Sequence, residues 1–156
     1  MIINYKESLE EFISYLNDHK NWVLATSCDD EVTARMISIV NVGYIMYFQT
    51  AKAFEKYQQI INIEKIALCI GNYQVKAVAK EIGHPFDEKN IFFKELYKKH
   101  HLKSYERYSK MSDEVIIKVN PTEVKIWKYI DNIPFQEIIN INDRKAEMHE
   151  YKIEQS

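Results

Sequence analysis

The stretch that decides the fold lies between Arg35 and Gln74, and its first part, residues 35–50, reads RMISIVNVGYIMYFQT. Apolar, β-branched and aromatic residues lie on both sides of a short turn at Asn41 to Gly43. Two such runs around a turn that contains glycine are typical of a β-hairpin. The sequence therefore predicts two paired strands, at residues 32–40 and 44–50.

Short strands separated by turns or helices are predicted for most of the remaining chain. Strands are expected at residues 22–28, 65–71, 73–83, 115–119, 122–130 and 134–141, with a turn at Gly71-Asn72, a hairpin turn at Asn120-Pro121 and the last segment as an edge strand. Helices are expected at residues 5–19, with Ser8 as the N-cap, at 51–61, and at 87–111, where a break near 102–104 divides two helices.

The turns between these strands are too short for parallel crossovers, so the sheet is expected to be antiparallel. Six or seven such strands with few glycines predict a mainly β fold, a small closed barrel with helices on its rim. At 156 residues the chain is expected to be a single domain, 1–156, with a helical insertion at about 87–111. The charged tail, residues 142–156, is expected to be helical or frayed.

Composition excludes several classes of function. A formal net charge of −2 provides no overall field for nucleic acid or an anionic membrane. The sequence has no apolar run near the ~18 residues of a membrane span and no signal-peptide core at its N-terminus, so a cytoplasmic location is expected. Cys28 and Cys69 have no metal-ligand spacing and are expected to be reduced thiols. No metal site is predicted at His100-His101, which lack further ligands.

Polar residues near Arg35 suggest a site for an anion. A cation on an otherwise apolar strand needs an anionic partner, and Arg35 offers a planar fork suited to phosphate oxygens. Thr50 follows a strand and is predicted to cap the next helix, whose Lys56 adds a point charge. Gln74, just after a turn, carries an amide that can read the edge of a heterocycle, although an exposed turn residue is the simpler interpretation.

This ordered set of residues resembles the pyridoxamine 5'-phosphate oxidase-like FMN-binding split-barrel superfamily, and in particular its small general-stress and nitroimidazole-reductase-like members. The resemblance covers residues 20–82 and, more loosely, the Glu123-to-Trp127 strand. It implies a split β-barrel, a homodimer, and FMN in grooves between the subunits. The cofactor-binding residues it implies are Arg35, Met36, Ile37, Ser38, Gln49, Thr50, Lys52, Lys56, Gln74 and Trp127.

Within that set, the resemblance assigns the phosphate to Arg35, Thr50 and Lys56, and the isoalloxazine to the backbone of residues 36–40. Gln74 would contact the edge of the ring, and Trp127 would approach from the other subunit. The function implied is that of an FMN-dependent oxidoreductase acting on an unknown small molecule, because the flavin itself carries the redox chemistry. No catalytic side chain is predicted.

Two residues depart from the family pattern, and both favour an alternative function. Phe54 stands where relatives have serine, and Glu55 stands where the oxidase proper has arginine, although Lys52 would restore one charge. These changes favour a non-catalytic flavin-binding or sensing module of the same fold. The oxidase's C-terminal substrate-binding pattern is not recognisable, so pyridoxamine phosphate oxidation is not expected. A third interpretation, RNA binding by the Lys- and Tyr-rich stretch 94–110, is less favoured than a helix whose aromatic residues pack inward.

Overall fold

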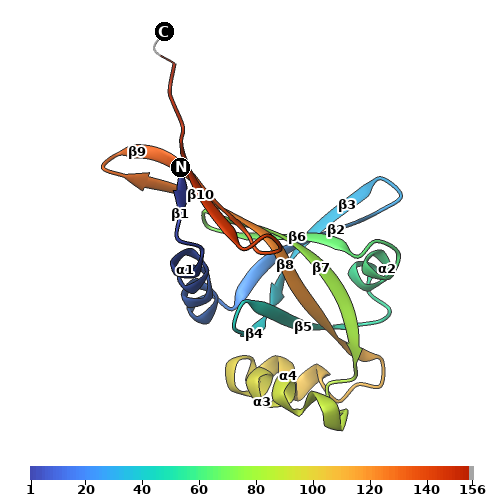
Figure 1. Cartoon of the computed structure of the whole chain (residues 1–156). Coiled ribbons are helices and arrows are strands. Elements are labelled where there is room, and N and C mark those ends of the chain that lie inside the picture. Colours follow the sequence, from blue (N-terminus) through green and yellow to red (C-terminus); the bar gives the residue numbers. More distant parts are fainter. Residues whose placement is uncertain (155–156) are drawn as a thin grey trace.

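Alternating apolar residues and short turns fold most of the chain into one antiparallel sheet with helices on its rim (Figure 1). The computed structural model describes residues 1–154, so the last two residues of the predicted tail lie outside the described part. The strands are β1 (Ile2–Ile3), β2 (Asn21–Cys28), β3 (Glu31–Ser38), β4 (Val40–Val42), β5 (Ile45–Ala51), β6 (Lys65–Ile70), β7 (Tyr73–Gly83), β8 (Glu114–Ile130), β9 (Ile133–Asn140) and β10 (Lys145–Glu150). The helices are α1 (Tyr5–Asp18), α2 (Glu55–Asn62), α3 (Ile91–His100) and α4 (Leu102–Tyr108), with a short 3-10 turn, η1 (Glu88–Asn90), before α3.

Every pairing among the described strands is antiparallel, in the order β1-β10-β9-β8-β7-β6-β2-β3, while β5 pairs with both β4 and β8. The mainly β, antiparallel prediction is therefore confirmed. Two details at the end of the chain were wrong. Part of the predicted helical or frayed tail forms β10, and β9 is not an edge strand, because β10 covers its outer side.

The predicted hairpin turn at Asn120-Pro121 is also wrong, because β8 runs unbroken from Glu114 to Ile130. On one side β8 pairs with β7, while on the other it pairs first with β5, up to Val119, and then with β9, from Glu123. Pro121 lies at this changeover, where its missing N–H removes no bond to β5 or β9. A strand that changes partners at a proline looks like a turn in the sequence.

A β-bulge at the same point lets both halves of β8 face the barrel core. Lys76 of β7 pairs with Glu123 and Ala77 pairs with Pro121, so Thr122 is the extra residue. One extra residue reverses which side chains face inward. The core-facing residues are accordingly odd-numbered before the bulge and even-numbered after it: Val115, Ile117 and Val119, then Val124 and Ile126.

The first half of β8 and its partner β5 are covered on both faces. Their inward side chains, including Phe48, join the main core, whereas Tyr47 and Ile116 point the other way into a second core. Phe93 and Tyr97 of α3 complete that second core and are almost fully buried. The aromatic residues of the helical insertion thus pack inward, as expected, and hold α3 and α4 against β4 and β5 (Figure 1).

Helix α1 begins one turn earlier than the predicted cap. Asn4 is the N-cap, and its side chain accepts a bond from the Glu7 N–H. Ser8 instead lies inside the helix, where it is buried and donates to Glu137 Oε1 at 3.4 Å. Asparagine is as good an N-cap as serine, so the apolar spacing alone did not decide between the two positions.

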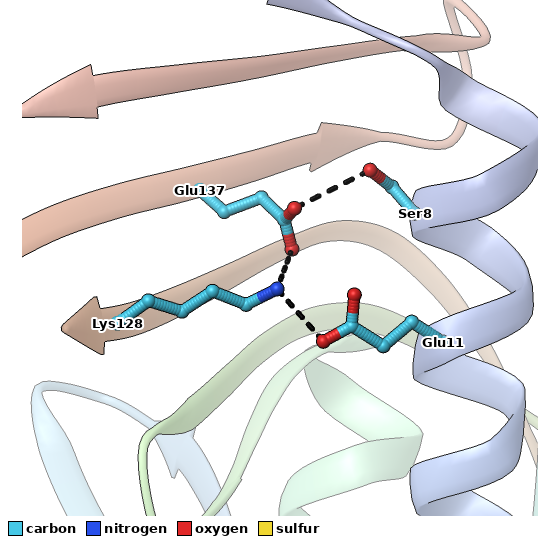
Figure 2. Close-up of polar contacts among 4 residues, drawn as sticks. All are labelled: Ser8, Glu11, Lys128 and Glu137. Atoms are coloured by element: carbon cyan, nitrogen blue, oxygen red, sulfur yellow. Dashed lines mark hydrogen bonds and ion pairs between the residues drawn. The ribbon is translucent and has the colours of Figure 1, made fainter. Parts of the chain in front are cut away.

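Ion pairs of Lys128 hold α1 against β8 and β9 (Figure 2). Lys128 Nζ of β8 lies 2.7 Å from Glu11 Oε1 of α1 and 3.3 Å from Glu137 Oε2 of β9. The Glu137 side chain is almost fully buried, and its Oε2 is an ion-pair partner of Lys128 outside hydrogen-bond geometry. A buried carboxylate of this kind needs the cation, because the long hydrogen bond from Ser8 to Oε1 replaces only a small part of its lost hydration.

We therefore predict that Lys128→Met lowers the free energy of unfolding by about 3 kcal/mol, because Glu137 loses its cation while the aliphatic packing is kept. Urea unfolding at neutral pH measures this value. The matched control is Lys6→Met, since Lys6 forms a fully exposed pair with Glu10 and should cost about 0.5 kcal/mol or less. A Lys128→Met/Glu137→Gln double variant should recover much of the loss. If Lys128→Met and Lys6→Met lowered the free energy of unfolding equally, Lys128 would not be the cation that stabilises Glu137.

Candidate cofactor-binding site

The predicted cofactor residues on β3 point to opposite faces of the sheet, as the alternation in the sequence predicts. Ile37 is buried in the core, and Arg35 lies on the same inner face. Met36 points outward with 60% of its surface exposed, and Ser38 shares that face. The side chain of Arg35 and the side chains of Met36 and Ser38 therefore lie on opposite faces of β3.

Arg35 is held by neutral oxygen atoms of β2 and of its own strand, β3. Its Nη1 donates to Thr26 Oγ1 at 2.8 Å and to the Leu24 carbonyl at 3.3 Å, and its Nη2 donates to Thr33 Oγ1. Both threonines also donate to Gln59 Oε1 of α2. This network orients the guanidinium and leaves its positive charge to be balanced by other groups. Burial lowers the pKa of Arg35, and Glu55 opposes this shift only in part.

Lys56, in the first turn of α2, is a second cation near Arg35. Burial lowers its pKa, Arg35 lowers that pKa further, and Glu114 acts in the opposite direction. Its Nζ lies 4.7 Å from the centre of the Phe54 ring, a cation–π distance. Two half-buried cations that raise each other's free energy are stabilised by an anion that both can reach.

Thr50 is not the helix cap that the sequence predicts. It is the buried penultimate residue of β5, and its Oγ1 donates to the Ala51 carbonyl at 3.3 Å. Helix α2 begins only at Glu55, with Phe54 as N-cap and no side-chain capping bond. A turn that contains Lys52 separates the two elements, and the Lys52 N–H donates to the Asp113 carbonyl at 3.0 Å.

Gln49 faces the helical insertion. Its Oε1 accepts a bond from Ser109 Oγ at 2.7 Å, which connects β5 to the residue after α4. It therefore lies on the other face of β5 from Thr50, although both reach the same cavity at the end of the strand.

The outward-facing candidates lie in one row across the sheet. The register places Met36 opposite Val23, Val23 opposite Cys69, and Cys69 opposite Gln74. Met36 and Gln74 are thus three strand spacings apart, about 14 Å. Gln74 and Trp127 line one open cavity of about 480 Å³, together with Cys69. The structure therefore brings Gln74 close to Trp127 of the same chain and leaves Met36 at the other end of the row.

Strand β3 ends the sheet in the described part of the chain, where it pairs with β2 alone. The other edge of β3 presents backbone N–H and C=O groups that no strand among residues 1–154 uses. A ligand along this edge can reach Arg35 on the inner face and the backbone of Met36 to Ser38 without crossing the strand. The edge thus connects the two groups of predicted residues.

The sequence analysis did not identify the residues that orient Arg35. It also did not identify Glu114, whose carboxyl group lies near Lys56. Thr33 lies two residues before Arg35, a spacing that places both on one face and could have been noticed. Thr26 and Gln59 come from other elements and gave no local signal. Glu114 begins β8 and is almost completely buried, and burial together with Asp113 raises its pKa to about 7.

A membrane-spanning helix and a metal-binding cluster are both absent from the described residues. Within residues 1–154, no helix is long and apolar enough to cross a membrane. Nor do His, Cys, Asp and Glu side chains of this part of the chain form a group of three or more that could hold a metal ion.

Comparison with known proteins shows which solved structures share this fold. No family model matches the sequence, and no curated protein does so either. Solved structures match well: general stress protein 26 from Bacillus anthracis has a TM-score of 0.62 at 20% identity, with 85% of this chain and 98% of that chain covered. A pyridoxamine 5'-phosphate oxidase-related, FMN-binding protein from Nostoc punctiforme has a TM-score of 0.65 at 9% identity, with 97% and 98% covered. A heme storage protein from Vibrio cholerae has a TM-score of 0.62 at 11% identity, with 76% and 91% covered.

The chain therefore has the split-barrel fold of the pyridoxamine 5'-phosphate oxidase-like proteins, as the resemblance implied. Structures with this fold have different descriptions: one is an FMN-binding protein and another is a heme storage protein. The fold alone does not select between such ligands, so the residues at the site must do so.

We predict that Glu114→Gln changes how stability depends on pH. The folded-state pKa of about 7 lies above the ordinary 4.5, so the folded state binds the proton more tightly and the parent loses stability as pH rises from about 4.5 through 7. Glutamine has no such proton, so at pH 8 the variant should be more stable than the parent by about 2 kcal/mol. Urea unfolding at pH 5 and pH 8 measures the difference.

The control is Glu106→Gln, which changes an exposed glutamate of α4 and should keep the parent's pH dependence. A Glu114→Gln variant that follows the parent at both pH values would show that this carboxyl group titrates normally.

Proposed function

We propose that this protein binds FMN along the free edge of β3 and acts as an FMN-dependent oxidoreductase on a small molecule. The observation that carries the proposal is the pair Arg35 and Lys56, two cations with lowered pKa values at the end of the barrel. A phosphate group supplies the negative charge that this pair lacks, and arginine and lysine are the side chains best suited to phosphate oxygens.

The residues present fit this cofactor. Arg35 and Lys56 would hold the phosphate, with Lys52 in the adjoining turn as an additional cation, and the backbone of residues 36–38 would contact the ring. The network of Thr26, Thr33 and Gln59 keeps the Arg35 guanidinium oriented before any ligand binds, which reduces the entropy lost on binding. When bound, FMN supplies the hydride or electron transfer, and the chain supplies binding and orientation.

A homodimer is part of this proposal. The outer face of β3 exposes large apolar side chains, with Val32 at 71% and Met36 at 60% exposure. Next to them, the small residues Ala25 and Ala67 line two open hollows of the same face, one of which also contains Gln74. Such a surface is suited to a second copy of the chain, which would cover the flavin ring and exclude water from it.

A second candidate, a module that has weakened or lost flavin binding, is favoured by two residues. Glu55 lies close enough to Arg35 to affect its pKa and so supplies part of the negative charge that a phosphate would bring. Phe54 places its ring beneath the Lys56 ammonium. Both residues compete with a bound phosphate for the same cations, so their effect on affinity distinguishes the two functions.

We predict that Lys56→Ala weakens FMN binding by about 1.5–3 kcal/mol, the value of a hydrogen bond to a charged group. Titration of FMN into purified protein, followed by flavin fluorescence, measures the dissociation constant. Lys103→Ala is the control, because Lys103 is an exposed lysine on α4. Unchanged affinity in Lys56→Ala would place the phosphate elsewhere.

We also predict that Glu55→Gln tightens FMN binding by about 0.5–1 kcal/mol, because it removes an exposed negative charge beside the phosphate site. Glu64→Gln, at an exposed glutamate just beyond the end of α2, controls for the change in net charge and should leave the affinity unchanged. If neither the parent nor Glu55→Gln binds FMN while both remain folded, flavin binding itself is refuted.

A further inference from the structure

A cavity of about 470 Å³ lies between the end of β5, the start of β8 and the helical insertion. Most of its wall is aromatic or apolar, from Phe54, Tyr97, Tyr108 and Met111. Its size and mostly apolar lining are those of a site for a small organic molecule. Three predicted cofactor residues, Gln49, Thr50 and Lys56, line part of it, but the rest of the cavity has no part in the function proposed above.

A buried carboxyl group lines the same cavity. Glu114 is only 5% exposed, and its side chain lies on the face of β8 that the helical insertion covers. Tyr97 of α3, Tyr108 of α4 and Lys56 of α2 line the cavity around it, together with Asp113 beside it in the chain. Burial raises the pKa of Glu114 even though the charge of Lys56 acts in the opposite direction. A ligand that carries positive charge would relieve this remaining cost of burying the carboxylate.

The charges in the cavity are divided between two ends. Lys56 lies over the Phe54 ring, and its pKa is lowered by burial and by Arg35 and raised by Glu114, so Lys56 is the cation that both ends of the cavity share. Asp113 and Glu114 form the anionic end, and Asp113 contributes to raising the pKa of Glu114. With both carboxyl groups ionised, the cavity has one more negative charge than positive charge. Aromatic faces between the two ends favour flat groups and cations.

We propose that this cavity, the α4 cavity, binds a small aromatic molecule that carries an ammonium group. The ammonium pairs with Glu114, and the ring lies among the side chains of Phe54, Tyr97 and Tyr108. The inference does not depend on FMN, because Glu114 comes from β8 and Tyr97 and Tyr108 come from the helical insertion. Where FMN binds as well, its phosphate balances Lys56 and leaves the anionic end of the cavity for the amine.

The test uses benzylamine and the full-length protein without added flavin, with binding measured by isothermal titration calorimetry. Benzyl alcohol and benzoate serve as the neutral and anionic probes of the same size. We expect benzylamine to bind more tightly than either, and its affinity to rise between about pH 6 and pH 8 as Glu114 ionises. Glu114→Gln should weaken benzylamine binding about tenfold, the loss expected for a charge-assisted hydrogen bond, and leave benzyl alcohol unaffected.

Glu106→Gln is the matched control and should bind benzylamine like the parent, because Glu106 is exposed on α4. Thermal unfolding of each variant confirms that it is folded. Tighter binding of benzoate would show that Lys56 dominates the cavity and would overturn the proposal. So would equal benzylamine binding by the parent and Glu114→Gln, or no binding of benzylamine at all. None of these results bears on FMN, whose binding is measured separately with Lys56→Ala.

Discussion

The unbroken path of β8 is the constraint on which the rest of the structure depends. This one strand pairs with β5, β7 and β9, so it joins the barrel to the sheet that carries α1. The bulge at Thr122 keeps apolar side chains directed into the core on both sides of the changeover. Without that extra residue, one half of β8 would turn its apolar side chains to solvent.

Each end of β8 in turn positions a different part of the molecule. Near the C-terminal end, Lys128 joins α1 to β9 through the buried Glu137 (Figure 2). At the N-terminal end, Ile116 supports the second core, and Glu114 lies beneath α4. At the opposite edge of the sheet, β3 and α2 bring Arg35 and Lys56 together. The proposed cofactor site and the α4 cavity meet at Lys56, which lies between them.

Much of this arrangement could be predicted from the sequence, because it depends on local pattern. The alternation of β3, the Gly71-Asn72 turn and the inward packing of Phe93 and Tyr97 all follow from periodicity and turn chemistry. The path of β8 could not be predicted, because a proline beside an asparagine is an ordinary turn signal. The change of pairing from β5 to β9 has no signature in the local sequence. For the same reason Glu114 was missed, since its burial depends on a helical insertion packing over β8.

The directions of side chains could be predicted where one strand decided them, whereas contacts between several elements could not. Arg35 and Met36 point to opposite faces as their spacing requires, and the network around Arg35 became visible only with β2 and α2 in place. Thr50 was assigned as a helix cap because a hydroxyl residue ended an apolar run, but a short turn moves the helix start to Glu55. Gln49 was grouped with the cofactor residues by the family resemblance, and its bond from Ser109 could not be predicted because the two residues are 60 positions apart.

The most direct test of the central claim is to measure flavin stoichiometry and molecular mass on the same sample. Protein is saturated with FMN, passed through a size-exclusion column, and followed by light scattering and by flavin absorbance. A site on the β3 edge that is covered by a second copy predicts one FMN per chain, eluting with a particle of twice the mass of one chain. A folded particle with the mass of a single chain and no flavin absorbance would contradict the account.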